Sequence, residues 1–360
     1  MSINNSSIFI IAEAGVNHNG NADMAFQLVD AAIEAGADAV KFQTFKAKNL
    51  VTKNAAKASY QKKTTSAEES QFEMLKRLEL SEKLHHELIS YCKNKNIQFL
   101  STAFDHESLN FLVNDLKIDR LKIPSGEITN APLLLAHAKT NKNLIVSTGM
   151  ATLGEIEEAL SVLAFGLVSD NEPSRQAFQA AYFSDKGQQA LKEKITLLHC
   201  TTEYPAPPAD INMKAMSSMS NAFGLSVGYS DHSEGIVVPI VAASMGAALI
   251  EKHFTLDKTL PGPDHKASLE PNELKAMIEA IRIVEVVVGD GRKCPKASEI
   301  DNRHVVRKSI VAAQKIDKGE LFTENNLAVK RPGYGRSPMQ YWDLVGTESL
   351  SSFDVDEIIK

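Results

Sequence analysis

Two short stretches of the sequence place ionisable side chains at the ends of apolar runs. The stretch GYSDHS contains Ser230 and His232, and the stretch IEKHF contains Glu251 and His253. The residues of each pair are two positions apart, so on a strand their side chains point to the same face. Two imidazoles with no third histidine and no thiolate nearby suit an open site for one divalent metal, completed by oxygen ligands and water. His232 and His253 are therefore candidate metal ligands.

Lysines and serines end several other apolar runs. VKFQTF carries a lysine, KIPSGE carries a lysine and a serine, and VSTGM carries a serine. Such a set suits a phosphate or a carboxylate, because it combines positive charge with several hydrogen-bond donors. The candidate anion-binding residues are Lys41, Lys122, Ser125, Ser147 and Ser230.

Carboxylates and further polar groups occupy similar positions. Such carboxylates can position water, orient ligands or accept protons. The carboxylates are Glu13, Glu127, Glu251 and Asp264, and the other polar residues that end runs are Gln43, Thr102 and Tyr204.

Each of these residues also has a purely structural interpretation. A lone histidine at a strand end is more often a hydrogen-bonded structural residue, and Lys41 alone could be a surface lysine. Every predicted strand contributes a polar group at the same end, however, and buried charges are costly unless they are paired or functional. The residue types thus indicate an anionic, phosphate-bearing substrate beside a metal, without naming a reaction.

Short β-branched runs alternate with helical patterns along most of the chain. This repeat predicts parallel strands joined by crossovers, and eight such units in about 280 residues match the size of a (β/α)8 TIM barrel. A doubly wound open sheet is the alternative, but no G-x-G-x-x-G motif follows the first run. The runs are 8–15, 39–45, 98–104, 120–127, 143–150, 195–204, 225–233 and 248–256. In a TIM barrel the carboxyl ends of the strands meet on one face, which carries the catalytic groups.

The remaining segments are predicted to form helices of this α/β barrel, a linker and a second domain. We expect a helix from about 68 to 94, additional helix over 165–194 packed outside the barrel, and a final helix from about Pro271 to Val288. The barrel domain then spans 1–288, a polar linker spans 289–305, and a small, mostly irregular or β domain spans 306–360.

Composition excludes several classes of protein. The chain has 360 residues and a formal net charge of -6, with no basic stripe of the kind that nucleic-acid binding requires. Its three cysteines are far apart, which argues against a disulfide framework or a thiolate zinc site and favours a reducing compartment. No stretch resembles a signal peptide or is long enough to span a bilayer. We expect a cytoplasmic protein without membrane or nucleic-acid partners.

The same stretches carry a family resemblance. AEAGVNHNG, VKFQTFK, KIPSGE, VSTGMAT, LHCTTEYPAP, GYSDHS, IEKHFTLD and PGPDHKASLEP resemble the bacterial sialic acid synthase family, in the same order. RKSIVA, KGE and VKRPGYG resemble its C-terminal antifreeze-like (SAF, β-clip type) module. The resemblance implies condensation of phosphoenolpyruvate with N-acetylmannosamine, or a related acetamido sugar, to give a sialic acid and phosphate. It also implies Mn2+ or Mg2+ as cofactor.

The resemblance also implies roles for the candidate residues. His232 and His253 would hold the metal, and Glu13, Glu251 and Asp264 would be catalytic, with Glu13 and Asp264 managing protons and water. Phosphoenolpyruvate would be bound by Lys41, Lys122, Ser125, Ser147 and Ser230. The sugar would be bound by Gln43, Glu127, Tyr204 and Arg331. The small domain would cover the active site of the other subunit of a domain-swapped homodimer, with Arg331 touching the N-acetyl group.

Three departures from the family pattern concern the sugar and the barrel surface. Thr201 and Thr202 stand where some relatives have an asparagine, STAF replaces the common STPF, and 165–194 is longer than in several relatives. Because TTEYP also occurs in legionaminic acid synthases, the alternative substrate is a 2,4-diacetamido-trideoxy-mannose.

Two other functions remain open. A Schiff-base aldolase would use Lys122 or Lys41 as a nucleophile. A sugar- or ice-binding protein led by the C-terminal module would leave the strand-end polar groups without a role.

Overall fold

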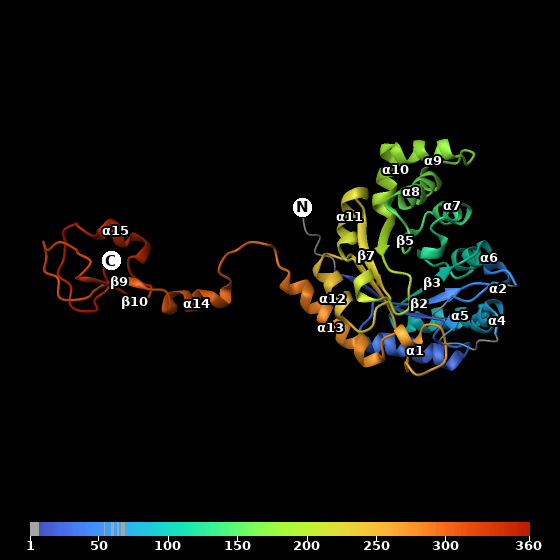
Figure 1. Ribbon diagram of the computed structural model, residues 1–360, viewed down its shortest axis with the longest axis horizontal. Helices are drawn as coiled ribbons and strands as arrows, with labels where there is room; N and C mark the ends of the chain where they lie inside the picture. Colours follow the sequence, from blue (N-terminus) through green and yellow to red (C-terminus); the bar gives the residue numbers. More distant parts are fainter. Residues whose placement is uncertain (1–6, 54, 59–60, 63–64, 66–68) are drawn as a thin grey trace. The chain divides into compact units, whose positions relative to one another are not determined.

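A computed structural model of the chain describes residues 7–53, 55–58, 61–62, 65 and 69–360. It divides into two compact units, Met1–Gly289 and Asp290–Lys360. In the first unit eight parallel strands form a closed barrel in chain order (Figure 1), so the TIM-barrel prediction is confirmed. The strands are β1 (Phe9–Gly15), β2 (Ala39–Thr44), β3 (Gln98–Ala103), β4 (Arg120–Ile123), β5 (Asn143–Ser147), β6 (Ile195–His199), β7 (Ser226–Asp231) and β8 (Leu249–His253).

The register of the strands brings the polar strand ends to one level of the barrel. The Cα of Glu13 on β1 pairs with the Cα of Lys41 on β2 and with that of His253 on β8. Thr102 and Lys122 pair between β3 and β4. Side chains that lie far apart in the sequence therefore converge at the carboxyl end of the barrel.

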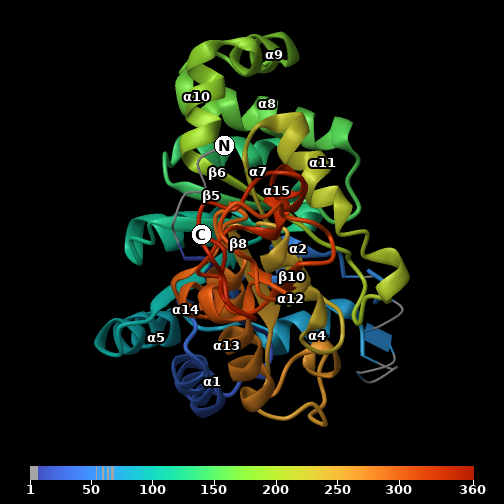
Figure 2. The same ribbon diagram turned by 90° about the vertical axis from the view of Figure 1, so that its left-hand side faces the viewer.

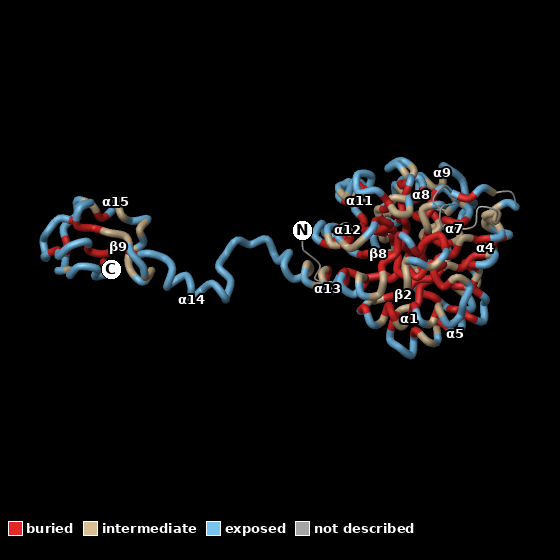
Figure 3. The backbone as a smooth tube through the Cα atoms, turned by 60° about the horizontal axis from the view of Figure 1, so that its bottom comes forward, coloured by how far each residue is buried: buried red, intermediate tan, exposed pale blue. Residues whose placement is uncertain are grey.

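Helices surround the barrel, and buried residues concentrate on the strands and on the inner faces of these helices (Figure 3). The helices of this unit are α1 (Ala22–Ala35), α2 (Ala47–Leu50), α4 (Gln71–Leu78), α5 (Glu82–Asn94), α6 (His106–Asn110), α7 (Ala131–Lys139), α8 (Leu153–Val168), α9 (Arg175–Phe183), α10 (Asp185–Lys194), α11 (Lys214–Phe223), α12 (Val237–Ser244) and α13 (Pro271–Val287).

The prediction of a single helix over about 68–94 is wrong in one respect, because the structure has two helices there, α4 and α5. Ser81 caps α5 by accepting a hydrogen bond from the Leu84 amide at 3.2 Å, and Glu79 accepts one from the Ala47 amide at 2.7 Å. A cap and a contact 32 residues away thus override a continuous helical pattern. The predicted start of the helix, residue 68, lies outside the described residues.

Residues 165–194 form the end of α8 and two further helices, as the sequence analysis expects of a segment outside the barrel. Helices α9 and α10 both pack on α8. Figures 1 and 2 show α9 beyond α8, whereas α10 also contacts β5 and β6. Neither helix supplies a residue to the pocket described below.

The C-terminal unit has a small core of its own. Two antiparallel strands, β9 (Ser309–Ala312) and β10 (Leu327–Lys330), pack with short turns and helix α15 (Tyr341–Leu344). The predicted linker 289–305 is largely helical at its end. It overlaps helix α14 (Ala297–Val306), all of whose residues are exposed. The core residues are Ile310, Ala312, Ile316, Phe322, Leu327, Leu344 and Ile359.

The described part of the chain contains no helix long and apolar enough to cross a bilayer. Cys92, Cys200 and Cys294 are all free thiols.

Candidate active site

A pocket of about 390 Å³ opens at the carboxyl ends of the barrel strands. Every candidate residue of the barrel domain lines it, although these residues come from all eight βα units. The lining includes Glu13, Lys41, Gln43, Thr102, Lys122, Ser125, Glu127, Ser147, Tyr204, Ser230, His232, Glu251, His253 and Asp264. The structure therefore brings together the groups that the sequence scatters over some 250 positions, as expected at this face of a TIM barrel.

Two lysines and two glutamates form a buried ion network on the pocket floor. Lys41 Nζ lies 2.6 Å from Glu13 Oε2 and 3.6 Å from Glu251 Oε2. Lys122 Nζ donates to Glu251 Oε1 at 2.9 Å, and Ser230 Oγ donates to the same oxygen at 2.8 Å. The two formal positive charges balance the two formal negative charges, which makes it possible to bury all four groups.

The two glutamates of this network titrate in opposite directions. Burial raises the pKa of Glu13 to about 7, against the attraction of Lys41, and the nearby Glu251 carboxylate raises it further. Burial also raises the pKa of Glu251, but Lys122 and Lys41 outweigh it and hold this pKa well below its usual range. Glu251 is thus an anion that holds both lysines, whereas Glu13 can gain or lose a proton near neutral pH.

Hydroxyl groups beside the network form a cradle for an anion. Ser147 Oγ and Thr202 Oγ1 are buried without a hydrogen-bond partner in the described part of the chain. Ser125 Oγ accepts from the Gly149 amide at 3.0 Å. A Cβ at Gly149 would lie 2.2 Å from Thr202 Oγ1, so only glycine allows this approach. Buried hydroxyls without partners beside two lysines suit the oxygen atoms of a phosphate or a carboxylate.

The two predicted metal-binding histidines lie together in the same pocket. Their ring centroids are 5.6 Å apart. His232 Nδ1 donates to the Thr201 carbonyl at 2.6 Å, which leaves the Nε2 lone pair to accept from the Tyr204 hydroxyl at 3.0 Å. His253 Nδ1 is buried without a hydrogen-bond partner among the described residues.

The protonation of these histidines fits a metal site. Burial lowers the pKa of His232 to about 4 and lowers that of His253 well below its usual value, so both rings are neutral at pH 7. Neutral imidazole is the form that binds metals. No cluster of three or more His, Cys, Asp or Glu side chains suited to a metal occurs within the described residues. Two protein nitrogens fit an open site completed by water and substrate.

Comparisons with known proteins agree with this geometry. The NeuB family matches residues 28–293, and the SAF domain matches residues 307–360. An N,N'-diacetyllegionaminic acid synthase of Campylobacter jejuni is 51% identical over 351 residues, covering 98% of each chain.

The chain belongs to the NeuB family. Another relative, the N,N'-diacetyllegionaminic acid synthase of Legionella pneumophila, is 46% identical and covers 94% of this chain and 89% of its own. Among solved structures, the N-acetylneuraminic acid (sialic acid) synthetase of Leptospira borgpetersenii, in complex with citrate, superposes with a TM-score of 0.66 at 33% identity. That match covers 83% of this chain and 90% of the other.

Arg331 is the one predicted site residue that the barrel pocket of this NeuB-family chain does not contain. It lies in the C-terminal SAF unit, where its side chain is exposed and its Nε donates to the Val306 carbonyl at 2.9 Å. Its predicted contact with the sugar remains a prediction.

Two features of the NeuB-family site escaped the sequence analysis. Thr202 lines the pocket, although the sequence analysis treated it only as a departure from the family pattern. Gln61 and helix α4 also form part of the pocket, which Met74 and Leu75 line from the helix. The apolar face of α4 gave a helical signal, but no local pattern distinguishes an apolar face that lines a pocket from one that packs on the core.

Proposed function

We propose that this protein condenses phosphoenolpyruvate with 2,4-diacetamido-2,4,6-trideoxy-mannose to give N,N'-diacetyllegionaminate and phosphate. The observation that carries the proposal is the presence, in one pocket, of a lysine- and hydroxyl-rich cradle beside two neutral imidazoles. The choice of sugar is supported by the names of the Campylobacter and Legionella relatives, at 51% and 46% identity. These names favour the diacetamido sugar, which is the alternative substrate predicted from the sequence, over N-acetylmannosamine.

Phosphoenolpyruvate carries a phosphate and a carboxylate, which match the cationic floor and the hydroxyls. Lys41, Lys122 and Ser230 would exchange part of their contact with Glu251 for contact with this anion. Glu13 would take up a proton as the anion enters, because its pKa of about 7 lies close to neutral pH and added negative charge raises it further. The ion network of Lys41, Lys122, Glu13 and Glu251 would then carry a net positive charge toward its ligand.

The reaction requires a new C–C bond and the release of phosphate. C3 of phosphoenolpyruvate attacks the aldehyde carbon of the open-chain sugar, water adds at C2, and the C–O bond to phosphate breaks. Mn2+ or Mg2+ held by His232 and His253 would supply Lewis acidity to the aldehyde oxygen. Asp264 and Glu13 would transfer the protons of the added water, since both have pKa values raised by burial, to about 6 and about 7.

The sugar would lie between groups that can hydrogen-bond its hydroxyl and amide groups. Gln43, Glu127 and Tyr204 line the pocket above the ion network. Glu127 Oε2 accepts from Asn130 Nδ2 at 2.7 Å, which fixes the carboxylate that would receive a sugar hydroxyl.

A Schiff-base aldolase is less well supported. Burial lowers the pKa of Lys41, but Glu13 and Glu251 outweigh it and raise this pKa above its usual value. Lys122 is paired with Glu251 at 2.9 Å. An attacking amine must be neutral and free, but the two glutamates favour the charged form of Lys41, and the Lys122 amine donates to Glu251.

The test is phosphate release from phosphoenolpyruvate with each sugar, with and without a chelator, and identification of the product by mass. We expect metal-dependent release that is fastest with the diacetamido sugar. Faster turnover of N-acetylmannosamine would make the protein an N-acetylneuraminate synthase instead. Release without metal, or turnover of neither sugar, would contradict the proposal. A homodimer in which the SAF unit of one copy supplies Arg331 to the other is part of the same proposal.

A further inference from the structure

The pocket has two chemically different walls. Its lining from β4 to β8 and the loops after them consists mainly of serine, threonine, tyrosine, histidine and carboxylate side chains. Its lining from the loops after β2 and β3 is largely apolar, and Gln61 and Gln71 are the polar side chains there. We call this apolar set the α4 wall, and it consists of Leu50, Val51, Met74, Leu75, Leu78 and Phe104.

The α4 wall is a cluster of its own. Met74 and Leu78 belong to a small hydrophobic cluster, distinct from the main core, against which Leu50, Leu75 and Phe104 pack. Met74 and Leu78 are each 1% exposed, whereas Leu75 is half-buried and faces the pocket. The wall thus combines a packed base with side chains that a ligand can reach.

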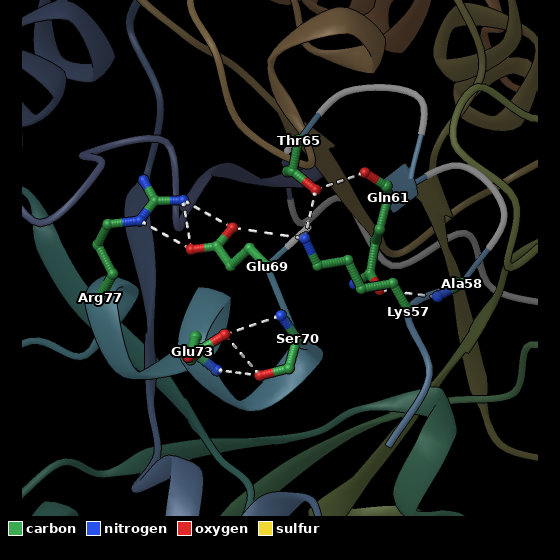
Figure 4. Close-up of polar contacts among 8 residues, drawn as sticks. All are labelled: Lys57, Ala58, Gln61, Thr65, Glu69, Ser70, Glu73 and Arg77. Carbon is green, nitrogen blue, oxygen red and sulfur yellow. Dashed lines mark hydrogen bonds and ion pairs between the residues drawn. The ribbon is translucent and has the colours of Figure 1, made fainter. Parts of the chain in front are cut away.

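Polar contacts join the described residues Lys57, Thr65 and Glu69 to one another and to α4 (Figure 4). Lys57 Nζ lies 3.4 Å from Glu69 Oε2 and donates to Thr65 Oγ1 at 3.0 Å, and Arg77 Nη2 lies 3.3 Å from Glu69 Oε1. Thr65 Oγ1 donates to the Gln61 carbonyl at 2.6 Å. Lys57 is 7% exposed, so this ion pair is largely shielded from water.

These contacts orient Gln61, which lines the pocket. Its Oε1 accepts from the Ala58 amide at 3.0 Å (Figure 4). The carboxamide NH2 then has no partner among the described residues and can donate to a carbonyl oxygen of a ligand. Ser70 and Glu73 form a capping box that fixes the start of α4.

The closed strand order places this wall opposite His232 and Tyr204, whereas His253 ends β8, which lies next to β1. In an eight-stranded barrel β2 and β3 lie across from β6 and β7, and His232 follows β7 while Tyr204 follows β6. A sugar whose aldehyde lies on the His232 side of the pocket therefore extends across the pocket and presents its far end to the α4 wall.

We propose that the α4 wall and Gln61 select a sugar that bears an acetamido group at C4 and a methyl group at C6. The inference rests on the proposed function. N-acetylmannosamine has a hydroxyl group at C4 and a hydroxymethyl group at C6. The apolar wall offers no partner to the C6 hydroxyl, whose burial is costly, whereas a methyl group there gains from burial. Gln61 donates to the carbonyl of the C4 acetamido group, which N-acetylmannosamine lacks.

The experiment compares kcat/KM for the two sugars at saturating phosphoenolpyruvate. Leu75→Gln is the central variant, because Leu75 reaches the pocket and its replacement leaves the packed base intact. We expect the ratio of kcat/KM, diacetamido sugar over N-acetylmannosamine, to fall about tenfold to a hundredfold, the range of discrimination available to an apolar pocket. Gln61→Ala, which removes only a polar contact, should lower the same ratio.

Leu167→Gln is the matched control, since Leu167 is a half-buried leucine on α8 that does not line the pocket. It should leave the ratio unchanged. Failure of the proposed function appears in the wild-type protein, as turnover of neither sugar or a preference for N-acetylmannosamine. Failure of this inference appears only in the variants. If the wild-type protein prefers the diacetamido sugar, and Leu75→Gln and Gln61→Ala reduce both sugars equally or neither, the α4 wall does not select the sugar.

Discussion

Asp231 Oδ2 and Lys252 Nζ form an ion pair 2.6 Å long between β7 and β8, and both side chains are 0% exposed. Lys252 also donates to the Ser233 carbonyl, and Asp231 Oδ1 accepts from the Ser233 amide and hydroxyl. Asp231 lies between Ser230 and His232 in the sequence, as Lys252 lies between Glu251 and His253. Because side chains alternate along a strand, this pair points away from the pocket and joins the two strand ends that carry the imidazoles.

We expect Lys252→Met to lower the free energy of unfolding by about 3–5 kcal/mol, because it leaves the Asp231 carboxylate buried and unpaired. Urea denaturation followed by circular dichroism at pH 7 measures the change. The double variant Lys252→Met/Asp231→Leu is the control and should recover most of the loss. A double variant no more stable than the single one would show that the lost stability does not come from the unpaired Asp231 carboxylate.

Lys122→Ala should raise KM for phosphoenolpyruvate much more than KM for the sugar. A hydrogen bond to a charged group contributes about 1.5–3 kcal/mol, which corresponds to roughly tenfold to a hundredfold in affinity. Steady-state phosphate release measures both constants. Lys142→Ala removes a half-buried lysine that pairs with the exposed Asp119 outside the pocket, and it should change neither constant. An effect confined to the sugar would assign Lys122 to the other substrate. Borohydride should trap no adduct on Lys122 in the wild-type protein.

His232→Ala and His253→Ala should each abolish metal-dependent turnover while the fold persists. A site with two protein nitrogens cannot lose one and keep its metal. Calorimetric titration with Mn2+ should detect binding to the wild-type protein and none to either variant. His86→Ala, which changes an exposed histidine, should bind Mn2+ normally. Full activity of either pocket variant at low metal would refute the assignment.

The stability difference between Asp264→Asn and the wild-type protein should depend on pH. Burial raises the pKa of Asp264 from an ordinary value of 3.8 to about 6. Below about pH 4 the carboxyl group is protonated in both the folded and the unfolded chain. Between pH 4 and 6 the unfolded chain loses its proton first, so the wild-type protein loses stability relative to the variant.

Above pH 6 this relative loss should be constant at about 3 kcal/mol, since each pKa unit corresponds to about 1.4 kcal/mol. Denaturation at pH 4, 5, 6 and 7 tests the profile. A difference in stability that stays the same from pH 4 to 7 would show that burial does not perturb this carboxyl group.

Arg331→Ala should lose sugar recognition and remain folded, if the SAF unit of one copy completes the site of another. Mixing Arg331→Ala with His253→Ala subunits should then restore part of the activity, because a mixed dimer has one site with both residues intact. Phosphate release after subunit exchange measures the recovery. If exchange is demonstrated and no activity returns, the arginine does not act across subunits.

Local patterns in the sequence predict the barrel and most of its pocket. Strand ends can be located because apolar runs, period-two alternation and the βα repeat depend only on neighbouring residues. In a closed parallel barrel all such ends meet on one face, so the polar residues near the ends of the runs, among them Lys41, Ser147 and His253, are predicted to share a pocket.

Only the tertiary structure decided how these groups interact. Lys122 and Glu251 are 129 residues apart, and no local pattern states that they pair. The pKa of Glu13 rises while that of Glu251 falls because each depends on burial and on which charges lie within a few ångströms. The same holds for the break between α4 and α5 and for the α4 wall. Both depend on which side chains the folded chain brings together, and such contacts between distant segments have no signature in the local order of residues.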